Sequence, residues 1–155
     1  MSRPNPFDEP PAPVEADEPQ RPPISRETDF GPKVIVAAIA VMVLLVAVVL
    51  RWTADGATGW EVVAGISGVT KLPRLFAILA LVFGVGCSVA SVMTRRWVVV
   101  FVTAAGCCVT SVTGLWAIWS QNTVPGHGPG FGLVLALVAM IVLAGRWATW
   151  ALSRD

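Results

Sequence analysis

The sequence is poor in charged side chains. Asp, Glu, Lys and Arg make up only 14% of its 155 residues, and 55% are hydrophobic, whereas soluble domains average about 25% and about 45–50%. The mean hydropathy is +0.70 and the formal net charge is +1. Because no surplus of Lys and Arg is available to neutralise phosphates, this composition predicts no nucleic-acid partner. It predicts a lipid bilayer as the solvent.

Metal-ligating side chains are scarce as well. His127 is the only histidine, so no second imidazole is available to hold a metal. The three cysteines, Cys87, Cys107 and Cys108, do not have zinc-site spacing and are predicted to be small buried hydrophobes. We therefore expect no metal site and no cofactor.

Catalytic groupings are also missing from the sequence. Asp55 and Glu61 are isolated acids in the loop 51–74, and the Gly-rich segment 125–132 lacks the Lys of a phosphate-binding loop. No Asp, Glu, Lys, Arg or His lies inside the four apolar runs 34–50, 75–93, 97–119 and 131–145, which argues against coupled transport. The sequence thus predicts no catalytic residue and a protein that is not an enzyme.

The N-terminal segment 1–33 differs from the rest of the chain. It holds nine of the twelve prolines and seven acids against four bases, a net charge of −3, while residues 34–155 carry +4. So few apolar groups cannot offset the entropy of ordering the chain. We predict a disordered or extended Pro-rich acidic tail in the cytoplasm, followed by a membrane domain over 34–155.

Four apolar runs follow the tail, and each is continuous rather than alternating, which favours helices over barrel strands. The predicted fold is all-α, a four-helix transmembrane bundle with approximate spans 34–52, 73–94, 97–119 and 131–152. Seven basic residues flank these spans on one side and three on the other. The excess predicts a multi-pass protein of the cell (inner or plasma) membrane with both termini cytoplasmic.

Tryptophan is concentrated at the predicted helix ends. Amphipathic indoles favour the membrane–water interface. Six tryptophans are therefore predicted at the interface: Trp52, Trp97, Trp116, Trp119, Trp147 and Trp150.

Small residues recur at helical spacing in the second and third runs. Without a hydrophobic drive between helices in lipid, close backbone approach along such faces supplies the packing energy. The predicted helix-packing residues are Gly84, Cys87, Ser88 and Ser91 in the second run, and Gly106, Thr110 and Gly114 in the third. With only 94–96 between them, these two runs are expected to form an antiparallel hairpin.

The layout as a whole resembles small four-helix membrane proteins of high-GC actinobacteria. The features that carry the likeness are the acidic Pro-rich tail, nine Arg to two Lys, Ala/Val-rich spans and terminal tryptophans. Some such proteins resemble a family encoded near tryptophan biosynthesis, and others are similar to accessory subunits of the cytochrome bcc-aa3 respiratory supercomplex. The respiratory resemblance implies a subunit that braces the catalytic subunits and holds no heme or copper ligand of its own.

The leading functional hypothesis is therefore a noncatalytic accessory subunit of a multi-subunit membrane complex. The best candidate for that complex is a respiratory cytochrome oxidase supercomplex. Its expected partners are other membrane-protein subunits and lipids, with the tail contacting a partner and no nucleic acid. Two alternatives stay open: a small homo-oligomeric channel or transporter, and a membrane scaffold that recruits partners through its tail.

Overall fold

The chain is described by a computed structural model at residues 34–66, 68, 70–126 and 128–153. The predicted tail, 1–33, lies outside the described residues. The helices are α1 (Val34–Val49), α2 (Gly59–Ala64), α3 (Lys71–Leu79), the π-helical segment η2 (Ala80–Cys87), α4 (Ser88–Thr94), α5 (Trp97–Asn122) and α6 (Phe131–Leu152). The described residues contain no strand, only two isolated bridges. The all-α prediction is confirmed.

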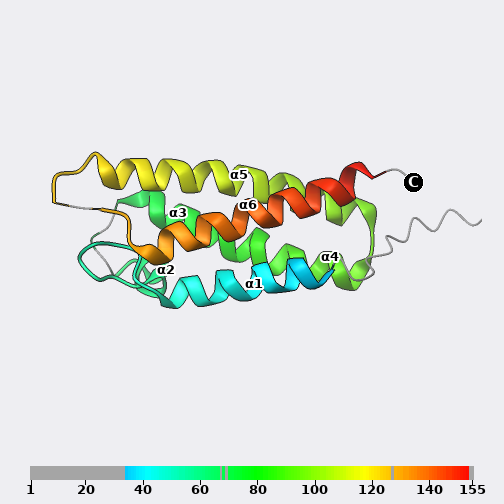
Figure 1. Cartoon of the computed structure of the whole chain (residues 1–155), viewed down its shortest axis with the longest axis horizontal. Helices are drawn as coiled ribbons and strands as arrows, with labels where there is room; N and C mark the ends of the chain where they lie inside the picture. The colour runs from blue at the N-terminus through cyan, green and yellow to red at the C-terminus, as the bar shows by residue number, and fades with distance from the viewer. Residues whose placement is uncertain (1–33, 67, 69, 127, 154–155) are drawn as a thin grey trace, which may run out of the picture.

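Because α3, η2 and α4 form one continuous rod, the bundle has four long helical rods. They lie side by side, and each runs antiparallel to its neighbours in sequence (Figure 1). One end of the bundle holds the start of α1, the α4–α5 turn and the end of α6. We call this the turn end. The opposite end, the loop end, holds α2 and the connection between α5 and α6 (Figure 1).

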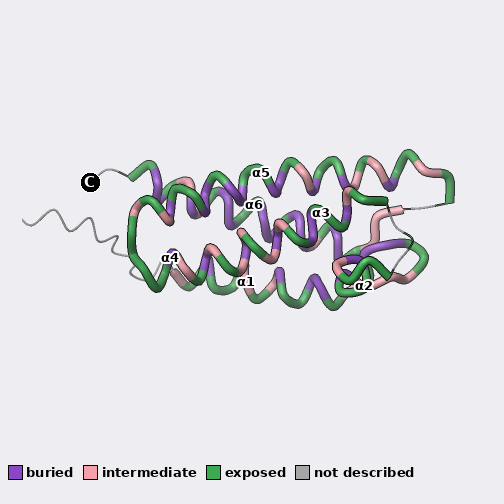
Figure 2. The backbone as a smooth tube through the Cα atoms, turned by 180° about the vertical axis from the view of Figure 1, so that it is seen from behind, coloured by how far each residue is buried: buried purple, intermediate pink, exposed green. Residues whose placement is uncertain are grey.

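Helix α6 lies at the centre of the packing and contacts both α5 and α1. Its inward face carries Leu133, Met140 and Leu143, all fully buried. The α3 and η2 parts of the second rod pack on α5, and η2 also contacts α1 and α6. Buried residues accordingly follow the inner faces of the rods, and exposed residues follow the outer faces (Figure 2).

Glycines let the second and third rods approach closely. A Cβ at Gly106 would collide with the ring of Phe83 in η2, and a Cβ at Gly114 would lie 2.7 Å from Cε2 of Phe76. Both aromatic rings therefore occupy notches on α5 that only glycine leaves open. These notches therefore set the distance between the two rods.

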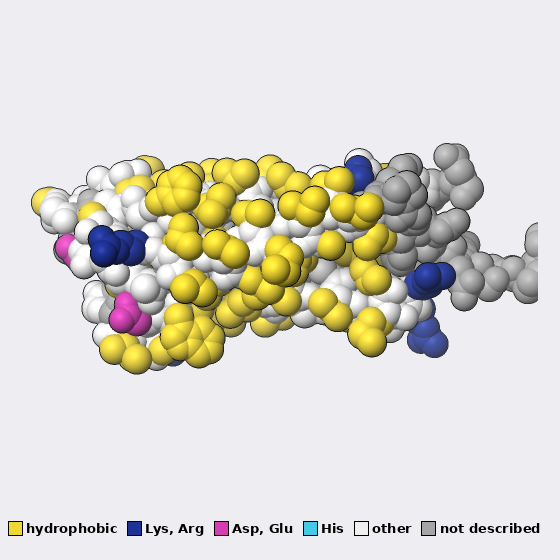
Figure 3. Space-filling model, turned by 60° about the horizontal axis from the view of Figure 1, so that its bottom comes forward, with side chains coloured by type: hydrophobic (Ala, Val, Ile, Leu, Met, Phe, Trp, Pro, Cys, Tyr) yellow, Lys and Arg dark blue, Asp and Glu magenta, His cyan; other side chains and the backbone are white. Residues whose placement is uncertain are grey.

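The outer surface of the bundle is apolar along its length. Figure 3 shows hydrophobic side chains over the middle of one face, with Lys, Arg, Asp and Glu towards the two ends. Three helical segments of the described chain are long and apolar enough to cross a membrane: Lys71–Thr94, Trp97–Asn122 and Phe131–Leu152. The shorter α1 is apolar throughout.

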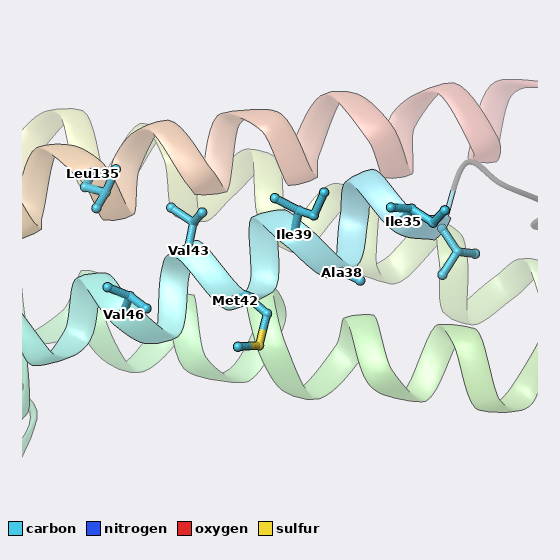
Figure 4. Close-up of a pocket in the computed structure, with 8 residues that line it drawn as sticks. Ile35, Ala38, Ile39, Met42, Val43, Val46 and Leu135 are labelled. Carbon is cyan, nitrogen blue, oxygen red and sulfur yellow. The ribbon is translucent and has the colours of Figure 1, made fainter.

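A shallow groove of about 560 Å³ lies on the outer face of α1. Its walls come from α1 and from Leu135 of α6, and side chains such as Ile39 and Met42 line it (Figure 4). All lining residues are apolar: Val34, Ile35, Ala38, Ile39, Met42, Val43, Val46 and Leu135. The groove therefore offers no polar group that could select a ligand.

Replacing Gly106 with alanine should destabilise the bundle by about 1–3 kcal/mol, because the new methyl group must displace the ring of Phe83. Thermal unfolding of the purified chain measures the change. Gly145 on α6 is the matched control: it has open space around it, so Gly145→Ala should stabilise the helix by up to about 1 kcal/mol. Equal midpoints for the two variants would contradict the notch.

Candidate functional site

A cluster of buried polar side chains lies where η2 meets α4, α5 and α6. Trp147 of α6 donates from Nε1 to Oγ of Ser88 at 3.0 Å, and both residues are buried. Ser91, one turn further on, shares a 2.7 Å hydrogen bond with Oγ1 of Thr103 on α5. We call Ser88, Ser91, Thr103 and Trp147 the polar cluster. It ties three rods together in the interior of the bundle.

Backbone carbonyls of η2 complete this cluster. Thr103 also lies 3.2 Å from the carbonyl oxygen of Cys87, and Sγ of Cys107 lies 3.7 Å from the carbonyl oxygen of Phe83. A π-helix has poorer backbone geometry than an α-helix and often marks a functional site. Side chains of α5 therefore satisfy carbonyls in the stretch where the backbone departs from α-helical register.

The predicted packing residues lie largely in the interior. Gly84 is buried, and a Cβ there would lie 2.5 Å from Cδ2 of Leu44 and 2.7 Å from Sδ of Met140. Thr110 is fully buried and bonds back to Gly106 within its own helix. The buried members are Gly84, Ser88, Ser91, Gly106, Thr110 and Gly114.

The cysteines do not share one environment. Cys107 is buried, Cys87 is half-buried and Cys108 is exposed. The prediction that all three are buried hydrophobes is therefore wrong for Cys108, which lies on the outer face of α5. Adjacent residues of a helix point in different directions, so Cys107 and Cys108 cannot both face the interior.

Three of the six tryptophans predicted at the interface pack inside the bundle. Trp52, Trp147 and Trp150 are buried in the bundle rather than at its surface, and Trp150 packs edge-on to Trp147 with ring centroids 4.8 Å apart. Trp97 is half-buried and donates to the carbonyl of Ala151 at 3.2 Å. Only two of the six predicted interfacial indoles, Trp116 and Trp119, are exposed.

Trp52 instead fixes the loop end. Its Nε1 donates to the carbonyl oxygen of Ala47 at 2.7 Å, and its ring packs 5.6 Å from that of Phe76. The backbone of Gly130 passes so close that its amide donates to the carbonyl of Trp52 at 2.8 Å. Through its indole and its backbone carbonyl, Trp52 thereby joins α1, α3 and the start of α6.

Sequence reasoning missed Thr103 and the inward role of Trp147. Thr103 lies three residues before Gly106, so it extends the same small-residue face by one turn, and this spacing could have identified it. Trp147 offered no such signal, because an indole near a helix end can face either inward or outward. Its partner Ser88 is 59 positions away in sequence.

Gln121 is a buried polar residue outside the cluster. It is 3% exposed, and neither its Oε1 nor its Nε2 has a hydrogen-bond partner among the described residues. An unsatisfied buried amide costs free energy comparable to a lost hydrogen bond. The unpaired amide of Gln121 therefore lowers the free energy of unfolding.

Charged residues of the described chain lie towards the two ends of the bundle (Figure 3). At the turn end these are Arg95, Arg96 and Arg146, whose guanidinium carbon lies 5.8 Å from the ring centroid of Trp150. Within the described residues no three His, Cys, Asp or Glu side chains gather as a metal site would need. His127 lies outside those residues.

Comparison with known proteins identifies the family. A family model described as the MiaB C-terminal domain matches residues 16–155. The chain belongs to this family. It is also 42% identical over 133 residues to a protein named tRNA-2-methylthio-N(6)-dimethylallyladenosine synthase, from Mycobacterium avium (strain 104). That alignment covers 81% of the chain and 18% of the relative. No solved structure matches.

Membership of the MiaB C-terminal domain family overturns the resemblance to respiratory supercomplex subunits. The predicted noncatalytic accessory role in a membrane complex is likewise wrong, as are its channel and scaffold alternatives, because the match points to tRNA modification. The prediction that the chain is not an enzyme is contradicted too, since the matched relative is a synthase. The low fraction of charged residues misled these predictions, because apolar helices carry few charged residues whatever the function of the chain.

The predicted partners and location are corrected by the same findings. Membrane-protein and lipid partners with no nucleic acid were expected, whereas the relative carries tRNA in its name. The chain was also placed as a multi-pass protein of the cell membrane with cytoplasmic termini, and its match within a tRNA-modifying synthase contradicts that placement. Net charge was a poor guide here because this chain matches only 18% of the relative.

Replacing Gln121 with methionine should raise the free energy of unfolding by about 1–3 kcal/mol, because the change removes two unsatisfied amide atoms at similar volume. Denaturant unfolding monitored by circular dichroism measures it. Gln121→Glu provides the control and should destabilise the bundle, since it places a charge at the same buried position. A methionine variant less stable than the unsubstituted chain would contradict the unsatisfied state of the amide.

Proposed function

We propose that the chain acts in forming 2-methylthio-N(6)-dimethylallyladenosine in tRNA, and that its helices form a transmembrane bundle. The observation that carries the first part is the 42% identity over 133 residues to a synthase of this nucleoside. The family match over residues 16–155 supports it independently. Because the chain covers 18% of that relative, the synthase activity itself belongs to the proposal.

The second part rests on the dimensions of the bundle. At about 1.5 Å per residue, α5 and α6 are roughly 39 and 33 Å long, and the hydrocarbon core of a bilayer is about 30 Å thick. Helix α1 has 16 residues, about 24 Å, and is the short member of the set. These lengths support the finer description of the fold as a transmembrane bundle.

The outward side chains support the same description. Val109 at the middle of α5 is 61% exposed, and Ile39 of α1 is 58% exposed. A water-soluble domain rarely exposes apolar patches larger than a few hundred Å², whereas here large apolar side chains cover the outside of every rod. Lipid solvates such a surface without cost, because its chains are as apolar as the side chains.

Exposed aromatic residues at the loop end fit an interface. Trp116 and Trp119 of α5, Trp60 of α2 and Phe131 at the start of α6 are all more than 60% exposed. Indoles favour the headgroup region because they combine an apolar body with a polar N–H. Trp97 and Trp116 are separated by 19 residues along α5, about 28 Å, which matches one bilayer thickness.

Deleting the gene should lower the amount of the 2-methylthio nucleoside in tRNA and raise the amount of the dimethylallyl nucleoside that lacks the methylthio group. Mass spectrometry of nucleosides from digested tRNA measures both. Expression of the chain from a plasmid should restore the ratio. Unchanged nucleoside levels in the deletion strain would contradict the role in tRNA modification.

Placing a charge at the centre of α5 tests the bilayer separately. Val109→Lys should cost about 2.5–3.5 kcal/mol if this face meets lipid, and less than about 0.5 kcal/mol if it meets water. Val98→Lys, 63% exposed at the start of α5, is the matched control because lysine there can snorkel to the surface. Alkaline carbonate extraction measures membrane retention, and equal retention of both variants would contradict a transmembrane bundle.

A further inference from the structure

Helix α4 is held to the bundle by hydrogen bonds rather than by apolar packing. Its only buried residues are Ser88 and Ser91, whose hydroxyls bond to Trp147 and Thr103. Its large apolar side chains point outward, and Met93 is 79% exposed. By contrast, α6 buries Leu133, Met140 and Leu143 among other residues. The attachment of α4 therefore depends on a few polar contacts.

At both ends of α4 the backbone departs from α-helical geometry, and we call these two places joints. The helix is preceded by the π-helical segment Ala80–Cys87, which contains Gly84 and Gly86. Of all residues except proline, glycine has the lowest helix propensity. Helix α4 is followed by Arg95 in the left-handed region, with φ 50° and ψ 19°. A rod that changes register at one end and turns sharply at the other can move as a unit.

The register of the first joint depends on neighbouring helices. Hydrogen bonds in a π-helix are less favourable than those in an α-helix, so π-helices are rare and short. In η2, the carbonyl of Phe83 lies 3.7 Å from Sγ of Cys107. The carbonyl of Cys87 lies 3.2 Å from Oγ1 of Thr103, which shares its one hydrogen with the carbonyl of Val99 in its own helix at 2.8 Å. These contacts and the Gly106 notch favour the π register. Loss of the polar cluster removes part of the support for this register.

We infer that α4 is a hinged segment, which swings about η2 and the Arg95–Arg96 turn while α5 and α6 stay in place. The swing breaks the Ser88–Trp147 and Ser91–Thr103 hydrogen bonds and opens the polar cluster at the turn end. Interhelical hydrogen bonds in bundles of this kind are weak individually, so thermal motion can break and reform them. This inference rests on the proposed transmembrane bundle and not on the proposed role in tRNA modification.

Distance measurements between spin labels test the hinge in the full chain in lipid nanodiscs. Labels at Met93 on α4 and Thr149 on α6 report the swing, in a background where Cys87 and Cys108 are serine and the buried Cys107 is retained. Labels at Val98 and Thr149 report α5 against α6 and should give one narrow distance. All three labelled positions are exposed, so the labels leave the packing intact.

Ser88→Ala should enlarge a second, altered Met93–Thr149 distance population about threefold. Ser111→Ala is the matched control, because it also removes a buried hydroxyl but one that bonds only within its own helix, to Cys107. If Ser88→Ala fails to fold, Trp147→Phe removes the same bond from the other side. A distance distribution that Ser88→Ala leaves unchanged, or that Ser111→Ala shifts equally, overturns the hinge.

Discussion

Apolar side chains cover both the inner and the outer faces of the long helices, so hydrophobicity alone does not decide which face turns inward. Leu44 is buried in α1 while Ile39, five residues away, is exposed, and the two are equally apolar. In such a bundle the choice falls to close packing of small residues and to hydrogen bonds. Gly84 and Gly106 supply the first, and Ser88 with Trp147 supplies the second.

This constraint explains the uneven strength of the bundle. Where glycine notches and large apolar residues coincide, as between Gly114 and Phe76, the rods interlock. Where hydroxyl groups make the contacts instead, as along α4, the helix is held to its neighbours by a few hydrogen bonds that can break. The loop end is fixed by the indole of Trp52, whereas the turn end relies on the polar cluster. The two ends therefore differ in rigidity although both connect the same rods.

The sequence was enough to predict an all-α fold, because continuous apolar runs leave helices as the simplest way to satisfy the backbone. It was not enough to orient the tryptophans. Trp147 faces inward because Ser88, 59 positions away, accepts its N–H, and no local pattern reveals that pairing. The π register of η2 was equally hidden, since it depends on Thr103 and Gly106 of another helix.

The family was beyond reach of the sequence pattern for a related reason. Function was inferred from absent motifs, but residues 34–152 are shaped by helix packing, which many unrelated bundles share. Only comparison over 133 residues connected the chain with tRNA modification. The bundle and the tRNA connection together lead to the central claim, that this helical chain acts in the synthesis of the 2-methylthio nucleoside of tRNA.

The most direct test of that claim is the rate of 2-methylthio nucleoside synthesis in extracts of cells with and without the chain. We predict synthesis when the chain is present, and its loss when the chain is deleted. Equal rates with and without the chain would contradict the account.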